Sequence, residues 1–224
     1  MSKIQSMAMA FIACVALSVI GQEYEIEALT APRASRLVAE SEEGATNLML
    51  PYVSSVDVET AHELAKATQA GLLLDGLLSV DKKTARELAA FSGFVLSLNG
   101  ITNLESGTAD ELSAFEGRAL VLNGLEVIDL IAARKLVQFK GQAIFLDGIK
   151  EMCPKVAEAF VGFRGKYVGM YGLQEIDKEL MAVLMRWRVE KISLREEVLT
   201  MEAKEIMARH KHSWEIIGDV WAAF

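Results

Sequence analysis

Residues that form covalent cross-links are scarce in this chain. Its 224 residues include two cysteines, Cys14 near the N-terminus and Cys153 in the second half. Cys14 lies in an apolar N-terminal stretch, and removal of that stretch would leave one cysteine and no intrachain disulfide. We therefore expect the fold to be held together by packing alone.

Runs of lysine and arginine are also absent. Basic and acidic residues are mixed along most of the chain, and the net charge is −8. Because nucleic-acid binding needs clustered positive charge, we expect no nucleic-acid partner. The sequence contains neither a glycine-rich phosphate loop nor a Gly-x-Ser-x-Gly motif, so it offers no cofactor site of these kinds and no sign of an enzyme.

The chain has one conspicuous apolar run, Met7 to Ile20, which follows the positive charge of Lys3. Its 14 residues are fewer than the roughly 20 that a membrane span needs, and they suit a secretory leader. We expect cleavage before Gln22, so that residues 1–21 are a signal peptide and the protein is secreted or periplasmic. The alternatives are an uncleaved N-terminal anchor, which would keep the protein on a membrane, and a lipid-modified Cys14.

The chain is rich in internal repetition. Six blocks spaced 24 residues apart share the pattern apolar-x-apolar, Asp/Asn-Gly, Leu/Ile, a short helical stretch and Phe-x-Gly; they begin at Leu48, Leu72, Leu96, Leu120, Ile144 and Val168. A period of this length indicates a solenoid. The spacing divides the chain into an N-terminal cap (22–47), six repeats (48–191), and a degenerate repeat with a C-terminal cap (192–224).

Each block predicts one strand and one helix. Leu96-Ser97-Leu98 alternates with the strand period of two, and the helical stretch places Ala109, Leu112 and Phe115 on one narrow face. Asn99-Gly100 marks the exit from the strand, where glycine permits positive φ, and Gly117 is predicted as a left-handed helix cap. Since one unit cannot bury its own apolar face, the strands should form a parallel sheet of seven to eight strands with the helices as an outer layer.

Four columns follow from the period. Alanine and leucine columns, together with Phe91, Phe115, Phe139, Phe163 and Trp187, are predicted as core. A column of acids, broken by Cys153 before Pro154, falls where each helix should begin: Asp57, Asp81, Glu105, Asp129 and Asp177. We interpret these acids as helix caps rather than metal ligands.

At the ends the pattern weakens. A helix is predicted from Pro32, and another over residues 195–210. Trp214-Glu-Ile-Ile-Gly218 predicts a last strand, and Trp221 and Phe224 are predicted to cover the open end of the core.

The histidines and Cys153 give little indication of a metal site or a catalytic site. His62 lies in the first predicted helix, and His210 and His212 form a His-x-His pair that lacks the further ligands of a structural zinc site. Cys153 has no histidine in its own or an adjacent repeat, so we read it as a tolerated substitution at a cap. We expect neither a catalytic residue nor a metal.

The repeat resembles leucine-rich repeats, and in particular variant repeats of secreted bacterial proteins. Leu72-Leu-Leu-Asp-Gly-Leu-Leu-Ser-Val80 with Ala85-Arg-Glu-Leu-Ala-Ala-Phe-Ser-Gly93 carries the likeness, which covers about residues 48–191. The standard asparagine column is replaced by leucine or isoleucine, whereas Asp75, Asn99, Asn123 and Asp147 stand two residues earlier and could bond the turns. The resemblance implies an α/β solenoid that binds proteins or surfaces.

A candidate binding face follows from strand alternation. One residue per strand should point away from the helices, in a largely apolar column rimmed by the Asp/Asn column; the predicted binding residues are Leu73, Asp75, Ser97, Asn99, Val121, Asn123, Phe145 and Asp147. We therefore expect a non-catalytic scaffold that binds a protein or envelope component. The alternative is a membrane-tethered structural envelope protein, with no specific ligand on the sheet face.

Overall fold

The computed structural model describes residues 29–41, 46–209 and 214–217. It contains eight short strands: β1 (Asn47–Met49), β2 (Gly71–Leu73), β3 (Val95–Ser97), β4 (Ala119–Val121), β5 (Ala143–Phe145), β6 (Tyr167–Gly169), β7 (Lys191–Ser193) and β8 (Glu215–Ile217). All neighbours are parallel and the strands lie in chain order, so the predicted α/β solenoid is confirmed.

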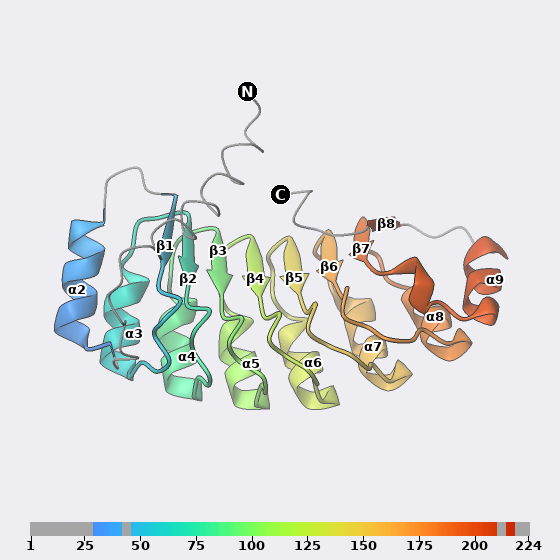
Figure 1. Ribbon diagram of the computed structural model, residues 1–224, viewed down its shortest axis with the longest axis horizontal. Coiled ribbons are helices and arrows are strands. Elements are labelled where there is room, and N and C mark those ends of the chain that lie inside the picture. Colours follow the sequence, from blue (N-terminus) through green and yellow to red (C-terminus); the bar gives the residue numbers. More distant parts are fainter. Residues whose placement is uncertain (1–28, 42–45, 210–213, 218–224) are drawn as a thin grey trace, which may run out of the picture.

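Helices alternate with the strands. They are α2 (Ala31–Glu40), α3 (Val58–Ala65), α4 (Lys82–Ala89), α5 (Ser106–Leu112), α6 (Leu130–Leu136), α7 (Pro154–Ala159), α8 (Lys178–Leu184) and α9 (Met201–Arg209), with short 3-10 helices η2 (Phe160–Gly162) and η3 (Glu196–Val198). Figure 1 shows the strands side by side and α3 to α8 in a parallel row, with α2 and α9 at opposite ends. The helix predicted over 195–210 is in fact η3 followed by α9.

The sheet keeps one register throughout. Every pairing joins residues 24 apart, from Leu48 with Leu72 to Ile192 with Ile216. The last pairing persists although the Asp-Gly motif has been lost from that unit. The 24-residue length of the unit therefore preserves the strand pairing even where its turn motif is missing.

The core lies between the sheet and the helix row. The predicted alanine and leucine columns are buried, and the rings of Phe91, Phe115, Phe139, Phe163 and Trp187 are each about 1% exposed. Phe91 stacks on Phe115, and Phe115 on Phe139, with ring centroids 6.2 and 6.1 Å apart. These rings lie in the loops after the helices rather than on the helices, because α5 already ends at Leu112.

The acidic column caps helices, as predicted, wherever it is aspartate. The side chains of Asp57, Asp81, Asp129 and Asp177 accept backbone N–H groups at the starts of α3, α4, α6 and α8. Hydrogen bonding by Thr60 lowers the pKa of Asp57 below its usual value. Glu105 and Cys153 make no such side-chain bond, and at α7 Pro154 occupies the first turn instead.

The glycines after the strands lie in turns, as predicted, but the predicted reason for glycine, a positive φ, is wrong. None of the column glycines has a positive φ; a Cβ on Gly124 would instead overlap the carbonyl oxygen of Asn99 and come within 2.8 Å of that of Ile101. A Cβ on Gly117 would overlap the ring of Phe115. Glycine is needed at these positions because adjacent turns, or a turn and a ring, pack too closely for a side chain.

Both described ends of the solenoid are covered. At one end α2 packs against α3, and the Thr60 hydroxyl donates to the carbonyl of Leu29 over 3.2 Å. At the other end the indole of Trp214, 3% exposed, donates to the carbonyl of Leu184 over 3.0 Å. The predictions for residues 1–21, His210, His212, Trp221 and Phe224 lie outside the described residues.

Candidate functional site

The predicted binding column points away from the helices. Leu96 and Leu98 belong to the main core, whereas Val121, Ala143, Phe145 and Tyr167 form a second apolar cluster on the other side of the sheet. This arrangement follows from strand alternation, because successive side chains point to opposite faces. Strands β1 to β7 each begin one residue earlier than the sequence predicts, so a further outward column, which includes Tyr167, was missed; β8 begins one residue later than predicted, at Glu215.

The predicted exposure of this column is wrong in the middle of the sheet. Ser97, Val121 and Phe145 are only 3, 5 and 7% exposed, whereas Leu73 is half-buried. Because adjacent strands lie about 4.8 Å apart, large side chains on neighbouring strands cover each other. The rings of Phe145 and Tyr167, for example, have centroids 4.9 Å apart. This central cluster adds packing rather than open contact area.

The predicted turn column forms a continuous hydrogen-bonded ladder. The side chain of Asp75 accepts the backbone N–H of Asn99 over 3.2 Å, and Asn99 accepts that of Asn123 over 2.9 Å. Asn123 then accepts the N–H of Asp147 over 3.0 Å, and Asp147 that of Tyr171 over 2.9 Å. This ladder takes the role that the absent standard asparagine column would have played.

The orientation of the two ladder asparagines has a chemical consequence. The side-chain oxygen of Asn99 accepts a hydrogen bond from the backbone N–H of the next turn, and that of Asn123 does the same. These bonds fix the plane of each amide. Among the described residues, neither Nδ2 group donates to another protein atom, and both side chains are half-buried rather than covered. Each asparagine therefore presents amide N–H donors from a fixed position at the surface.

The ladder ends where the side chains change. Pro51 holds the preceding position, and Tyr171 and Arg195 hold the following ones. The guanidinium of Arg195 donates to the carbonyls of Tyr171 and Leu173 over 3.1 and 2.8 Å and lies 5.8 Å from the centre of the Tyr171 ring. Arg195 thus bonds the last turn of the row, which the sequence analysis did not anticipate.

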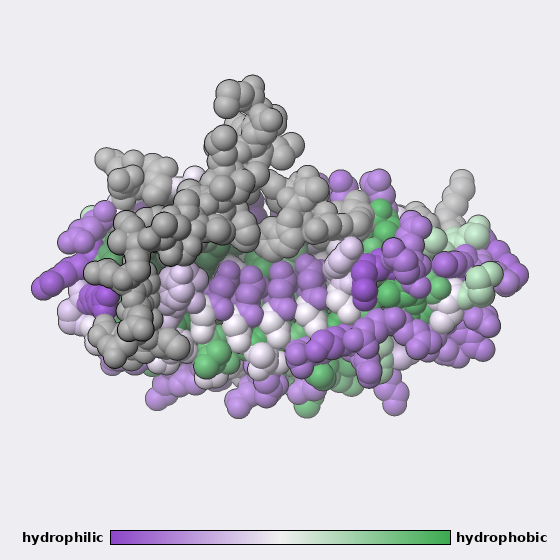
Figure 2. All heavy atoms as spheres, viewed as in Figure 1, coloured by the Kyte–Doolittle hydropathy of each residue, from purple (hydrophilic) through white to green (hydrophobic). Residues whose placement is uncertain are grey.

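Figure 2 shows a row of hydrophilic residues across the middle of this face, below strands β3 to β6. We call Leu73, Asp75, Asn99, Asn123, Asp147 and Tyr171 the ladder surface. Exposed apolar side chains occur nearby in the turns that follow the strands, where Tyr52 is 57% and Leu78 67% exposed. These residues also escaped prediction, because they belong to no repeated column.

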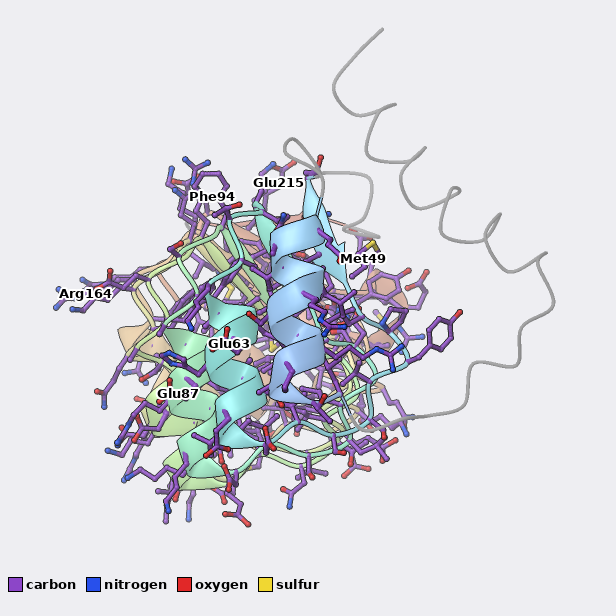
Figure 3. The ribbon with its side chains drawn as sticks, turned by 90° about the vertical axis from the view of Figure 1, so that its left-hand side faces the viewer. Met49, Glu63, Glu87, Phe94, Arg164 and Glu215 are labelled. Carbon is purple, nitrogen blue, oxygen red and sulfur yellow. The ribbon has the colours of Figure 1, made fainter. Side chains whose placement is uncertain are left out.

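Opposite charges pair between repeats on the helix side. Arg86 donates two hydrogen bonds to Glu111, over 3.0 and 2.8 Å; this contact lowers the pKa of Glu111 and raises that of Arg86. His62 on α3 lies 2.8 Å from Glu87 on α4, and Figure 3 shows Glu87 on this outer side. These pairs are exposed and link neighbouring helices.

Among the described residues, the other candidates for catalysis or metal binding are not grouped together. Cys153 is exposed at the start of α7 and has no capping bond. Within the described ranges, no three His, Cys, Asp or Glu side chains are grouped closely enough to hold a metal ion. Among the same residues, no helix has both the length and the apolar character needed to cross a membrane.

Comparison with known proteins gives little beyond the repeated architecture. No protein-family model matches the sequence, and no curated protein matches it. One solved structure with a match is a chain of the Toll–Spatzle complex of Drosophila, at 12% sequence identity and a TM-score of 0.40. The match covers 66% of this chain but 23% of that one, so the present chain aligns with under a quarter of its neighbour. The repeating pattern of parallel strands and helices is that of an α/β solenoid.

Proposed function

We propose that this protein is a non-catalytic repeat scaffold that binds a protein partner through the ladder surface. The supporting observation is the pair of asparagines whose side-chain oxygens are held in the ladder, because fixed amide donors at a surface are already oriented to meet a partner's carbonyl or carboxylate groups. Preorganised groups lose little freedom on binding, which favours affinity.

The surroundings of the asparagines suit such a contact. Helices α3 to α8 lie on the opposite side of the sheet (Figure 1). Half-buried Leu73 and Tyr171, which is 37% exposed, border the row. Aromatic and apolar side chains beside oriented polar groups are common in protein-binding surfaces.

The proposed setting is outside the cytoplasm. The apolar run from Met7 to Ile20 supports an export leader within residues 1–21, and the repeat pattern resembles secreted bacterial proteins. Cell fractionation with N-terminal sequencing tests this proposal. A soluble chain that begins near Gln22 supports release, whereas an intact N-terminus in the membrane fraction supports the tethered alternative.

The binding surface is tested with the double variant Asn99→Asp plus Asn123→Asp. Aspartate already serves in the ladder at positions 75 and 147, so the turns stay bonded while the amide donors become acceptors. Asn103→Asp plus Gln138→Glu is the matched control, because it adds the same charge at exposed positions elsewhere. Each protein is used as bait in envelope and culture extracts, and captured proteins are quantified by mass spectrometry.

We expect the control to retain the wild-type partners and the ladder variant to capture them at least tenfold less. Equal capture by wild type and ladder variant would contradict the proposal. Thermal unfolding of all three baits checks that any loss of capture reflects the surface rather than the fold.

A further inference from the structure

A second surface emerges from the Phe-x-Gly positions of the repeat. The first residue of this motif is a buried ring and the third packs closely on its neighbours. The middle residue is therefore held between two fixed neighbours and is exposed in each repeat. Along the solenoid, the middle residues are Ser92, Glu116, Lys140 and Arg164, and Arg188 holds the same position in Trp187-Arg188-Val189, where buried Val189 replaces the glycine.

The last three of these residues form a row of positive charge, the cationic row. Their loops are tied together, because the N–H of Lys166 donates to the carbonyl of Gln142 and the N–H of Glu190 to that of Lys166, both over 2.7 Å. Adjacent strands in this register lie about 4.8 Å apart, so the three cations follow one another at close spacing. Figure 3 shows Arg164 pointing away from the body of the molecule.

Other charges on the same edge leave it positive. Arg118, Lys166 and Lys191 add three cations, whereas Glu116, Glu190 and Glu215 supply three carboxylates. Among the described residues, six cations against three carboxylates give this edge a charge of +3 on a chain whose net charge is −8. Lys166 and Glu190 neutralise each other over 2.9 Å, but in the described part of the chain Lys140, Arg164 and Arg188 form no ion pair.

The row differs from the ion pairs that join neighbouring repeats at other places on the surface. Those pairs put opposite charges in contact, as in Arg86–Glu111, Lys150–Glu126 and Arg186–Glu158. Like charges in adjacent repeats repel and disfavour the fold. A bound anion would remove this repulsion, and two of the three side chains are arginines, which bind carboxylates through two parallel hydrogen bonds.

We propose that the cationic row binds an acidic segment of a partner polypeptide. A short run of carboxylates matches a row of three cations in length and sign. A long polyanion would extend past the row onto a surface that carries net negative charge and would be repelled there. Single-stranded nucleic acid also needs several rings for base stacking, whereas the exposed ring on this edge is that of Phe94, and Arg118, whose guanidinium lies 4.6 Å from the ring centre, covers one of its faces.

The test measures binding of a fluorescent octaglutamate peptide by anisotropy at low salt. In the triple variant Lys140→Ser, Arg164→Ser, Arg188→Ser, each cation is replaced by a residue that Ser92 shows the motif can hold. The matched control, Lys83→Ser, Lys155→Ser, Lys204→Ser, removes three exposed lysines from other places and has the same net charge.

We expect the triple variant to bind the peptide at least tenfold more weakly than the wild type, and the control to bind within twofold of it. Absence of binding by the wild type, or equal losses in both variants, would overturn the proposal. Tighter binding of an eight-residue oligothymidylate or of anionic phospholipid vesicles than of octaglutamate would also overturn it, in favour of those ligands. The ladder variant of the previous test should bind octaglutamate like the wild type, so the two proposals can fail separately.

Discussion

At the scale of single residues, space between successive turns decides which positions tolerate a side chain. Gly76, Gly100, Gly124, Gly148 and Gly172 each face the backbone of the preceding turn, and a Cβ there would overlap it. By contrast, nothing lies within 4 Å of a Cβ built on Gly162 in η2. The two kinds of glycine should therefore respond differently to substitution.

We expect Gly124→Ala to destabilise the protein by about 1–3 kcal/mol or more, because carbonyl groups of the adjacent turn must move to admit the methyl group. Gly162→Ala should be neutral or stabilising by up to about 1 kcal/mol, because alanine favours helical backbone. Urea unfolding followed by circular dichroism measures both. Similar losses in the two variants would show that the close approach at Gly124 does not limit stability.

Some residue roles could be predicted from the sequence, and others could not. The aspartate caps follow from the chemistry of one side chain next to one helix start, so Asp57 and Asp81 were assigned correctly. Glu105 occupies the same column, but its longer side chain makes no cap bond. The role of Gly124 depends on the distance between two repeats, which no single repeat contains.

At the scale of elements, the turns after β2, β3, β4 and β5 are each bonded to the next turn through one side chain. The period revealed which residues would be neighbours, so the ladder of Asp75, Asn99, Asn123 and Asp147 could be predicted. The exposure of the outward strand residues could not be predicted, because it depends on the bulk of side chains from adjacent strands. Phe145, which packs on Tyr167, was therefore predicted to be exposed and is buried.

We expect Asn123→Ala to cost about 1–3 kcal/mol, since the half-buried N–H of Asp147 would lose its acceptor. Asn123→Asp keeps an acceptor at the same place and should cost much less. Thermal and urea unfolding of the two variants give the comparison. If both lose the same stability, the hydrogen bond is not what the ladder contributes.

At the scale of the whole molecule, the 24-residue period turns separation in sequence into adjacency in space. The cations Lys140, Arg164 and Arg188 are 24 residues apart, so the sequence shows no run of basic residues at these positions. The fold places them in successive loops on one edge. The same principle makes each repeat depend on its two neighbours and on little else.

This dependence predicts that a whole repeat can be removed. Deleting residues 98–121 joins Ser97 to Leu122, so β3 would pair with β5 in the register that β4 now uses, and Phe91 would face Phe139. The ion pair of Arg86 with Glu111 is lost, but an exposed pair contributes at most about 1 kcal/mol. We expect a folded protein with the same circular-dichroism shape, one cooperative transition and a lower melting temperature.

The matched control deletes residues 99–121, one residue fewer. Leu98 then stays in front of Leu122, and the Asn123 turn is displaced by one position from the strand that precedes it. Because a one-residue shift exchanges the buried and outward faces of a strand, neither the core nor the ladder can form across the junction. This protein should unfold or aggregate. If both deletions behave alike, the length of the repeat is not what sets the register.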